Sequence, residues 1–141
     1  MAKFNPSAQL RRTLAERANG RCEYCQSPES FSPQAFSVEH IIPKSKGGND
    51  EPDNLAFSCQ GCNGFKYNKI EALDPVTGLT TPLYNPRLHR WNEHFSWDED
   101  GRYIIALTPV GRVTVSVLRL NRKYVLNLRK VLVLAGEHPP G

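Results

Sequence analysis

Two cysteine pairs constrain this chain of 141 residues more than any other feature of its sequence. They are Cys22-x-x-Cys25 and Cys59-x-x-Cys62, with 33 residues between the pairs. Two residues between cysteines let a tight turn present both sulfurs to one ion at about 2.3 Å. A disulfide scaffold is usually shorter and secreted, and a redox Cys-x-x-Cys normally occurs once. The spacing therefore favours a structural zinc site, with Cys22, Cys25, Cys59 and Cys62 as ligands, over these two alternatives.

The chain is mildly basic, with 18 Lys and Arg against 14 Asp and Glu and a net charge of +4. Residues 1–71 carry a net charge of +1 and residues 72–141 carry +3. This bias admits nucleic acid as a partner without requiring it. No apolar run approaches the roughly 18 residues of a membrane helix, and the N-terminus lacks the apolar core of a signal peptide. With the paired thiols, these features lead us to expect a cytoplasmic protein without a membrane partner.

Hydrophobic periodicity predicts an N-terminal helix from Ser7 to Asn19, with Ser7 as its N-cap. Between the cysteine pairs, residues 35–43 and 55–58 are predicted to form short strands, separated by a basic, glycine-rich turn at 44–50. A helix is expected from Cys62 to Glu71. The predicted order is therefore a cysteine turn, a strand, a turn, a strand, a second cysteine turn and a helix.

Within this order the sequence reads Cys22-x-x-Cys25, Glu39-His40-Ile41-Ile42-Pro43-Lys44-Ser45-Lys46-Gly47-Gly48, Asn54-Leu55 and Cys59-x-x-Cys62-Asn63-x-x-Lys66. Over residues 10–71, this sequence pattern resembles the HNH endonuclease family in its zinc-bearing form. The resemblance implies an α+β fold. Its ββα-metal core would be held together by the four-cysteine zinc site. An N-terminal helix would precede this core, and a C-terminal extension of a hairpin and helices would follow it. We therefore expect a zinc-bearing nuclease core at residues 1–74 and an extension at 75–141 that packs on this core.

The resemblance also implies a role for each residue of the site. His40 corresponds to the general base that activates water, and Glu39 and Asn63 correspond to ligands of one divalent cation. Asn54 corresponds to the residue that fixes the loop and orients the histidine. Because oxygen ligands suit Mg²⁺ or Mn²⁺, one of these ions is expected at the catalytic centre. Two positions vary from the family pattern: Glu39 stands where Asp is usual, and Asn63 replaces a second His.

Basic residues in both halves are candidates for contact with the DNA backbone. The candidates are Lys44, Lys46 and Lys66 in the core and Arg119, Arg122 and Arg129 in the extension. On one continuous helix, positions 119, 122, 126 and 129 would form a stripe. The alternative for Lys66 and for the arginines is an ordinary solvated helix face.

The extension reads as a loop at 74–86, a hairpin of residues 95–97 and 103–107, and two helices. Thr108-Pro109 signals the start of the first helix, although alternation of Val113, Val115 and Val117 leaves a strand possible. The second helix is expected at residues 122–134. No further ligands are spaced to make a metal site with His89 and His94, and Trp91 and Trp97 are expected in the core.

The resemblance therefore predicts a metal-dependent endonuclease that acts on DNA, double-stranded in our interpretation, and leaves 3′-hydroxyl and 5′-phosphate ends. The first alternative is a non-catalytic zinc module that binds nucleic acid. The second is a structural protein in which zinc serves to present the extension to a partner.

Overall fold

The computed structural model describes residues 4–140; residues 1–3, part of the N-terminal stretch considered above for a signal peptide, lie outside this range. It is a small mixed α/β structure with three separate two-stranded antiparallel sheets. Its helices are α1 (Ala8–Arg17), α2 (Gln60–Lys66), α3 (Trp91–His94), α4 (Pro109–Val117) and α5 (Lys123–Leu134). Its strands are β1 (Ser37–His40), β2 (Leu55–Ser58), β3 (Glu71–Leu73), β4 (Thr80–Pro82), β5 (Phe95–Trp97) and β6 (Ile104–Ala106). Within residues 4–140, no helix is both long and apolar enough to cross a membrane.

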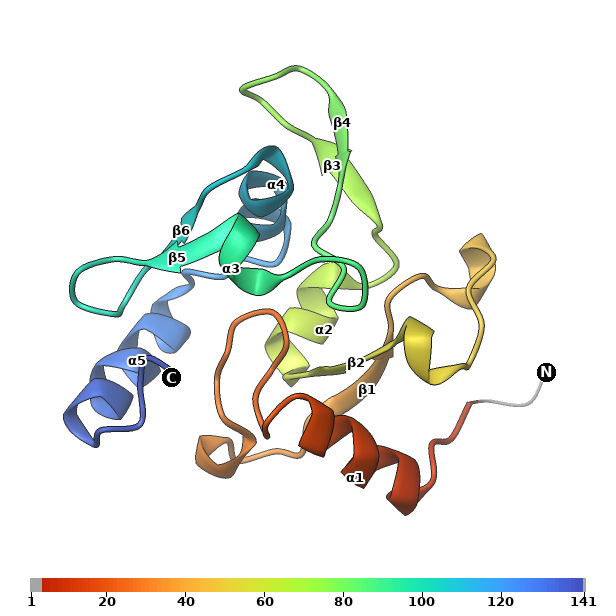
Figure 1. Cartoon of the computed structure of the whole chain (residues 1–141), viewed down its shortest axis with the longest axis horizontal. Helices are drawn as coiled ribbons and strands as arrows, with labels where there is room; N and C mark the ends of the chain where they lie inside the picture. Colours follow the sequence, from red (N-terminus) through yellow and green to blue (C-terminus); the bar gives the residue numbers. More distant parts are fainter. Residues whose placement is uncertain (1–3, 141) are drawn as a thin grey trace.

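The first half follows the predicted order of elements. Ser7 caps α1 as expected, since its side chain accepts a hydrogen bond from the Leu10 backbone N–H. Strands β1 and β2 pair in antiparallel register, with His40 opposite Leu55, and α2 lies beside them (Figure 1). The predicted extent of α2 is wrong: it ends at Lys66 because Tyr67 has a φ of 51°, and Glu71 instead begins β3. The β3–β4 hairpin, which projects from the molecule in Figure 1, was not predicted.

The second half contains the expected hairpin, β5–β6, and two helices. Thr108 caps α4 by accepting from the Gly111 backbone N–H at 3.0 Å, which decides residues 113–117 in favour of a helix. The stripe predicted for positions 119, 122, 126 and 129 does not form, because α4 ends at Val117 and α5 begins at Lys123. Arg119 and Arg122 therefore lie in the turn between two helices.

One hydrophobic core joins the two halves. It contains buried side chains of the first half, such as Leu14 and Phe57, together with Leu83, Phe95 and Leu120 of the second. Polar contacts cross the same boundary: the Trp91 indole N–H donates to the Tyr24 carbonyl oxygen at 3.0 Å. Residues of both halves thus share one core, while the division into a nuclease core at 1–74 and an extension packed on it stays a prediction.

Arg129 is buried at this junction, with 1% of its surface exposed. Its guanidinium donates to the carbonyl oxygens of Leu120 at 2.7 Å and Arg102 at 2.8 Å and to Asn121 Oδ1 at 3.1 Å. Burial lowers the pKa of Arg129 to about 10, so the side chain stays charged at neutral pH. The predicted DNA contact of Arg129 is therefore wrong, because its charge is used inside the protein.

We predict that Arg129→Met lowers the free energy of unfolding by about 3 kcal/mol or more. Each buried acceptor left without a donor costs about 1–3 kcal/mol, and this variant leaves several. Urea denaturation followed by far-UV circular dichroism measures the change. Lys130→Met is the matched control, since Lys130 is the exposed neighbour; equal stability of both variants would contradict the structural role.

Candidate functional site

The four cysteines converge although they come from two distant segments. Cys22 and Cys25 lie in the loop after α1, Cys59 is the N-cap of α2, and Cys62 lies within that helix. Their sulfurs all lie within 4.8 Å of one another, and the Cys25 and Cys59 sulfurs are 3.7 Å apart. Tetrahedral metal–sulfur bonds of about 2.3 Å place sulfurs about 3.8 Å apart. The cluster therefore fits a four-thiolate metal site.

Arg122 lies against this cluster from the extension. Its guanidinium donates to Cys59 Sγ at 3.5 Å and to Cys62 Sγ at 3.6 Å, and it also lies over the Phe65 ring. A positive charge here offsets the negative charge of thiolates. Arg122 is thereby held by the cysteine cluster, and this contact ties the turn between α4 and α5 to the first half.

His40 ends strand β1, and its side chain is 19% exposed. Its Nε2 lies 2.7 Å from Asp50 Oδ1, and the Lys44 ammonium donates to Asp50 Oδ2 at 2.9 Å. These hydrogen bonds from Lys44 and His40 hold the pKa of Asp50 below its usual value. The Phe4 ring meets the imidazole edge-on, with ring centroids 4.9 Å apart. His40 is thus held on two sides and stays partly open to solvent.

Asn54 fixes the connection between β1 and β2. Its Nδ2 donates to the carbonyl oxygens of Ile42 at 2.9 Å and Asn49 at 2.8 Å, and its Oδ1 accepts from the Ile42 backbone N–H. Gly48 permits this approach, since a Cβ there would lie 1.7 Å from the Ile42 carbonyl oxygen. These contacts hold the backbone that follows His40.

Glu39 points into the protein, where it is 4% exposed. Its Oε1 lies 2.5 Å from the Lys66 ammonium, and its Oε2 accepts from the Tyr24 hydroxyl at 2.8 Å. The Lys66 ammonium also donates to the carbonyl oxygens of Ile41 at 2.8 Å and His40 at 3.3 Å, so it is shared between Glu39 and the backbone. Burial raises the pKa of Glu39, and the Lys66 charge opposes this shift. Lys66 is 1% exposed, so its predicted contact with phosphate is wrong.

The expected catalytic cation does not fit Glu39 as it is placed. A carboxylate and an amide oxygen are suitable donors for Mg²⁺ or Mn²⁺. However, both Glu39 oxygens are already in contact with Lys66 and Tyr24, while the amide nitrogen of Asn63 faces Ser37 Oγ at 3.4 Å. A buried ammonium thus neutralises the carboxylate that the divalent cation would need.

Most of the residues described above lie in a segment whose sequence matches a known protein family. The HNH endonuclease family matches residues 22–69, from the first cysteine to just beyond the end of α2. This segment belongs to the HNH endonuclease family. The resemblance inferred from the sequence is therefore confirmed, and the four cysteines, His40 and Asn54 all lie within the HNH segment.

Similar proteins extend the comparison beyond the HNH segment. The chain is 28% identical to the Septu protein PtuB of Bacillus thuringiensis, over 80% of this chain and 41% of that protein. It is 24% identical to the Septu protein PtuA of Bacillus mycoides (strain KBAB4), over 90% and 21%. It is also 30% identical to the CRISPR-associated endonuclease Cas9 of Corynebacterium diphtheriae, over 54% and 7%. The chain thus spans less than half the length of each of these relatives.

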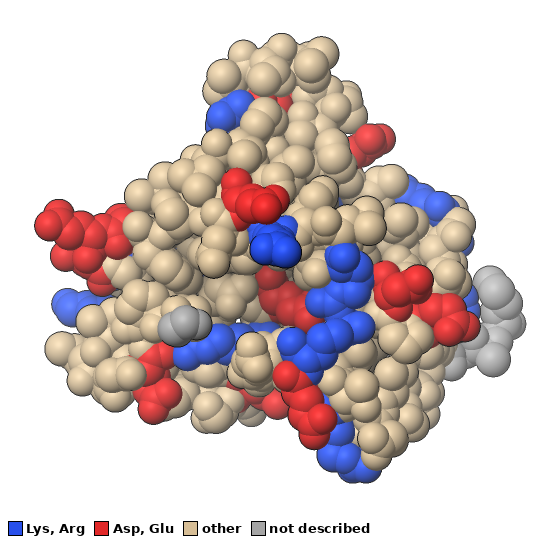
Figure 2. All heavy atoms as spheres, in the orientation of Figure 1, with Lys and Arg blue, Asp and Glu red and all other residues tan. Residues whose placement is uncertain are grey.

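The remaining basic candidates differ in their availability. Lys44 and Lys46 are exposed in the turn that follows the HNH histidine, although Lys44 pairs with Asp50 and Lys46 donates to the Asn68 carbonyl oxygen. Arg119 is exposed and lies over the Phe65 ring, 4.7 Å from its centroid. On the face seen in Figure 2, basic side chains gather near the centre and acidic side chains lie on several sides of them.

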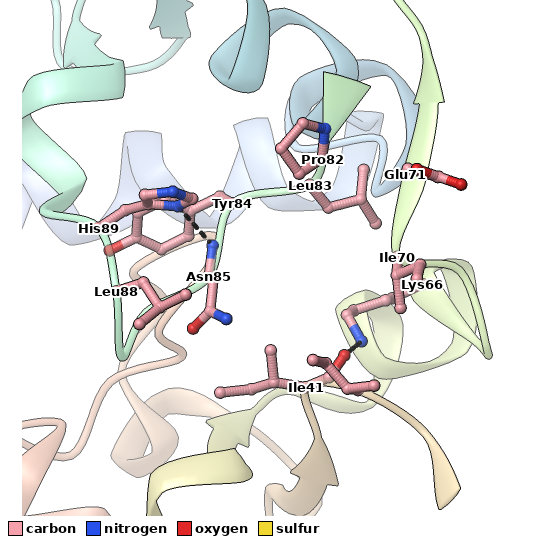
Figure 3. A pocket seen from close by; sticks show the side chains of 11 residues that line it. Ile41, Lys66, Ile70, Glu71, Pro82, Leu83, Tyr84, Asn85, Leu88 and His89 are labelled. Atoms are coloured by element: carbon pink, nitrogen blue, oxygen red, sulfur yellow. Dashed lines mark hydrogen bonds between the residues drawn. The ribbon is translucent and has the colours of Figure 1, made fainter. Parts of the chain in front are cut away.

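A cavity of about 290 Å³ lies between the HNH segment and the extension. Its walls are mostly apolar, with Ile41 and Ile70 on one side and Leu83 and Tyr84 on the other (Figure 3). Lys66 reaches the Ile41 carbonyl oxygen at its edge. His40 does not line this cavity, which is therefore separate from the face where the histidine meets Asp50.

We predict that Lys66→Met lowers the free energy of unfolding by about 3–5 kcal/mol, because it leaves the Glu39 carboxylate buried without its charge partner. Adding Glu39→Gln should recover part of this loss, since the amide can still accept from Tyr24. Urea denaturation of the two single variants and the double variant gives the coupling energy.

Lys69→Met serves as the control, because Lys69 is exposed on the segment that follows the same helix. It should stay within about 0.5 kcal/mol of the unmodified chain. Additive losses in the double variant would contradict the pairing of Lys66 with Glu39.

Proposed function

We propose that this chain is an endonuclease that hydrolyses phosphodiester bonds of double-stranded DNA, with His40 as the general base. The observation that carries this proposal is the position of His40 within the HNH segment. The histidine ends a strand, stays partly exposed and is held by Asp50 and Phe4, while Asn54 fixes the backbone that follows. The similarity to a protein named as an endonuclease supports the same reaction.

The proposed reaction begins when neutral His40 takes a proton from a water molecule near a DNA phosphate. The water oxygen then forms a bond to phosphorus, and the bond between phosphorus and the 3′ oxygen breaks. The departing oxygen takes a proton from solvent, and His40 later releases its own proton to solvent. The products carry a 3′-hydroxyl and a 5′-phosphate.

A requirement for Mg²⁺ or Mn²⁺ is part of this proposal as an expectation from the HNH family. In general, a divalent cation can stabilise charge on a phosphate and on a leaving oxygen. We assign no step of the reaction to such an ion, since Lys66 and Tyr24 already hold Glu39. Lys44 and Lys46, exposed in the turn that follows His40, are the lysines that we propose for contact with the DNA backbone.

The pairing of Glu39 with Lys66 also favours a second candidate. A zinc-bearing module without catalytic activity has no need of a free carboxylate, and its basic residues would serve only to bind nucleic acid. The two candidates differ in one measurable property, which is cleavage of the DNA.

We predict that the purified chain nicks or linearises supercoiled plasmid in Mg²⁺ or Mn²⁺ and that EDTA stops the reaction. His40→Ala should reduce the cleavage rate at least about 100-fold, since a general base contributes roughly 10²–10⁴-fold. Circular dichroism and metal content should match those of the unmodified chain. Full activity of His40→Ala would disprove the assigned base, and binding without cleavage in every metal would favour the second candidate.

We further propose that the four-cysteine cluster holds one structural zinc ion. Elemental analysis should find one zinc ion per chain, and Cys22→Ser should reduce this content. Because metal binding at such sites contributes directly to folding, a strong chelator should lower the unfolding temperature and weaken the far-UV circular dichroism signal. An unchanged spectrum after complete metal removal would contradict the structural role.

A further inference from the structure

Asp50 is the side-chain hydrogen-bond partner of His40 among the described residues. The Nε2 atom lies 2.7 Å from Asp50 Oδ1, and residues 4–140 provide no hydrogen bond to the second ring nitrogen, Nδ1. Asp50 is 10 residues away in the chain and reaches His40 through the connection between β1 and β2.

We propose that Asp50 is a positioning residue for the general base. It holds the His40 imidazole with its proton on Nε2, and this leaves Nδ1 as the atom that takes the proton from water. The inference rests on the proposed function, which it deepens by naming the reacting atom and the residue that selects it.

The choice of ring nitrogen follows from hydrogen-bond chemistry. An ionised carboxylate can only accept, and a neutral imidazole has one donor and one acceptor nitrogen. The short contact with Asp50 therefore requires the proton on Nε2, and the lone pair must lie on Nδ1. The other carboxylate oxygen of Asp50 accepts from Lys44 at 2.9 Å, so both oxygens of this side chain are committed.

The backbone around Asp50 is anchored on both sides. Before it, the Asn49 carbonyl oxygen accepts from the Asn54 side chain at 2.8 Å. After it, the Glu51 backbone N–H donates to the Asn49 side chain at 3.0 Å. The Phe4 ring meets the imidazole edge-on. These contacts fix both the Asp50 carboxylate and the His40 ring. The hydrogen bond between them therefore depends on the folded loop that joins β1 to β2.

The hydrogen bond between His40 and Asp50 gains strength when His40 takes up the proton. When Nδ1 accepts the proton of the attacking water, His40 becomes an imidazolium with a proton on each nitrogen. The Asp50 carboxylate stabilises this charge without taking the proton itself. Asp50 thus touches only the base, and its loss should slow the chemical step more than it weakens DNA binding.

The first test is nitrogen NMR of the histidine ring in the full chain at neutral pH. Comparison with His40→Ala assigns the signals of His40 among the four histidines. The unmodified chain should show the tautomer with Nε2 protonated, and Asp50→Ala should shift the ring to a mixture of tautomers. Asp50→Asn should retain the first tautomer, because its amide oxygen still accepts. Asp53→Asn, an exposed acid of the same loop, is the matched control and should change nothing.

The second test measures cleavage at saturating DNA together with DNA affinity. Asp50→Ala should lower kcat about 10- to 100-fold with little change in Kd, Asp50→Asn should be intermediate, and Asp53→Asn should resemble the unmodified chain. If the kcat and the His40 tautomer of Asp50→Ala both equal those of the unmodified chain, the inference is overturned, while the proposed endonuclease activity stands.

Failure of the proposed function has a different signature. An unmodified chain that cleaves no DNA in Mg²⁺ or Mn²⁺ would contradict the proposed endonuclease, whatever the NMR result. Cleavage by the unmodified chain that His40→Ala abolishes and Asp50→Ala leaves unchanged would overturn only the role of Asp50.

Discussion

The convergence of four cysteine sulfurs is the constraint on which the rest of the structure depends. It joins the loop after α1 to the N-terminus of α2, and β1 and β2 lie between these two points in the chain. Strands of four residues bury too little surface to be stable alone. The cluster and the shared hydrophobic core therefore hold the short hairpin in place. Because Arg122 donates to two of the sulfurs, the same cluster also fixes the turn between α4 and α5.

Because successive side chains of β1 point to opposite faces, a buried ion pair and a partly exposed histidine lie next to each other in the chain. Glu39 turns inward to Lys66 and Tyr24, whereas the next residue, His40, turns to Asp50 at the surface. Successive side chains on a strand point to opposite faces, so the acid and the histidine of one dipeptide enter different environments. The inward pair is a buried charge pair, whose net contribution to stability is small but whose disruption is costly. The outward pair is reachable by solvent, where a base must be.

Local signals in the sequence predicted the elements well. Ser7 and Thr108 are N-caps in the structure, and the strand at 55–58 has the predicted bounds. The cysteine spacing likewise predicted their convergence. The β3–β4 hairpin has only three residues in each strand, and such short strands carry too little alternation to detect. Asp50 was missed because an acid in a polar turn after two glycines looks like ordinary turn chemistry. Only the fold places it beside His40.

The charge of the extension shows why a residue count is a poor guide to a binding surface. Residues 72–141 carry a net charge of +3, but two of the three arginines proposed for DNA contact face the protein. Arg129 is buried among carbonyl oxygens and Arg122 lies on the cysteine sulfurs, which leaves Arg119 exposed. Electrostatic attraction depends on charges that solvent and phosphate can reach. The proposed DNA contacts of Lys44 and Lys46, in the half of the chain with the smaller net charge, therefore rest on the exposure of these side chains and not on a residue count.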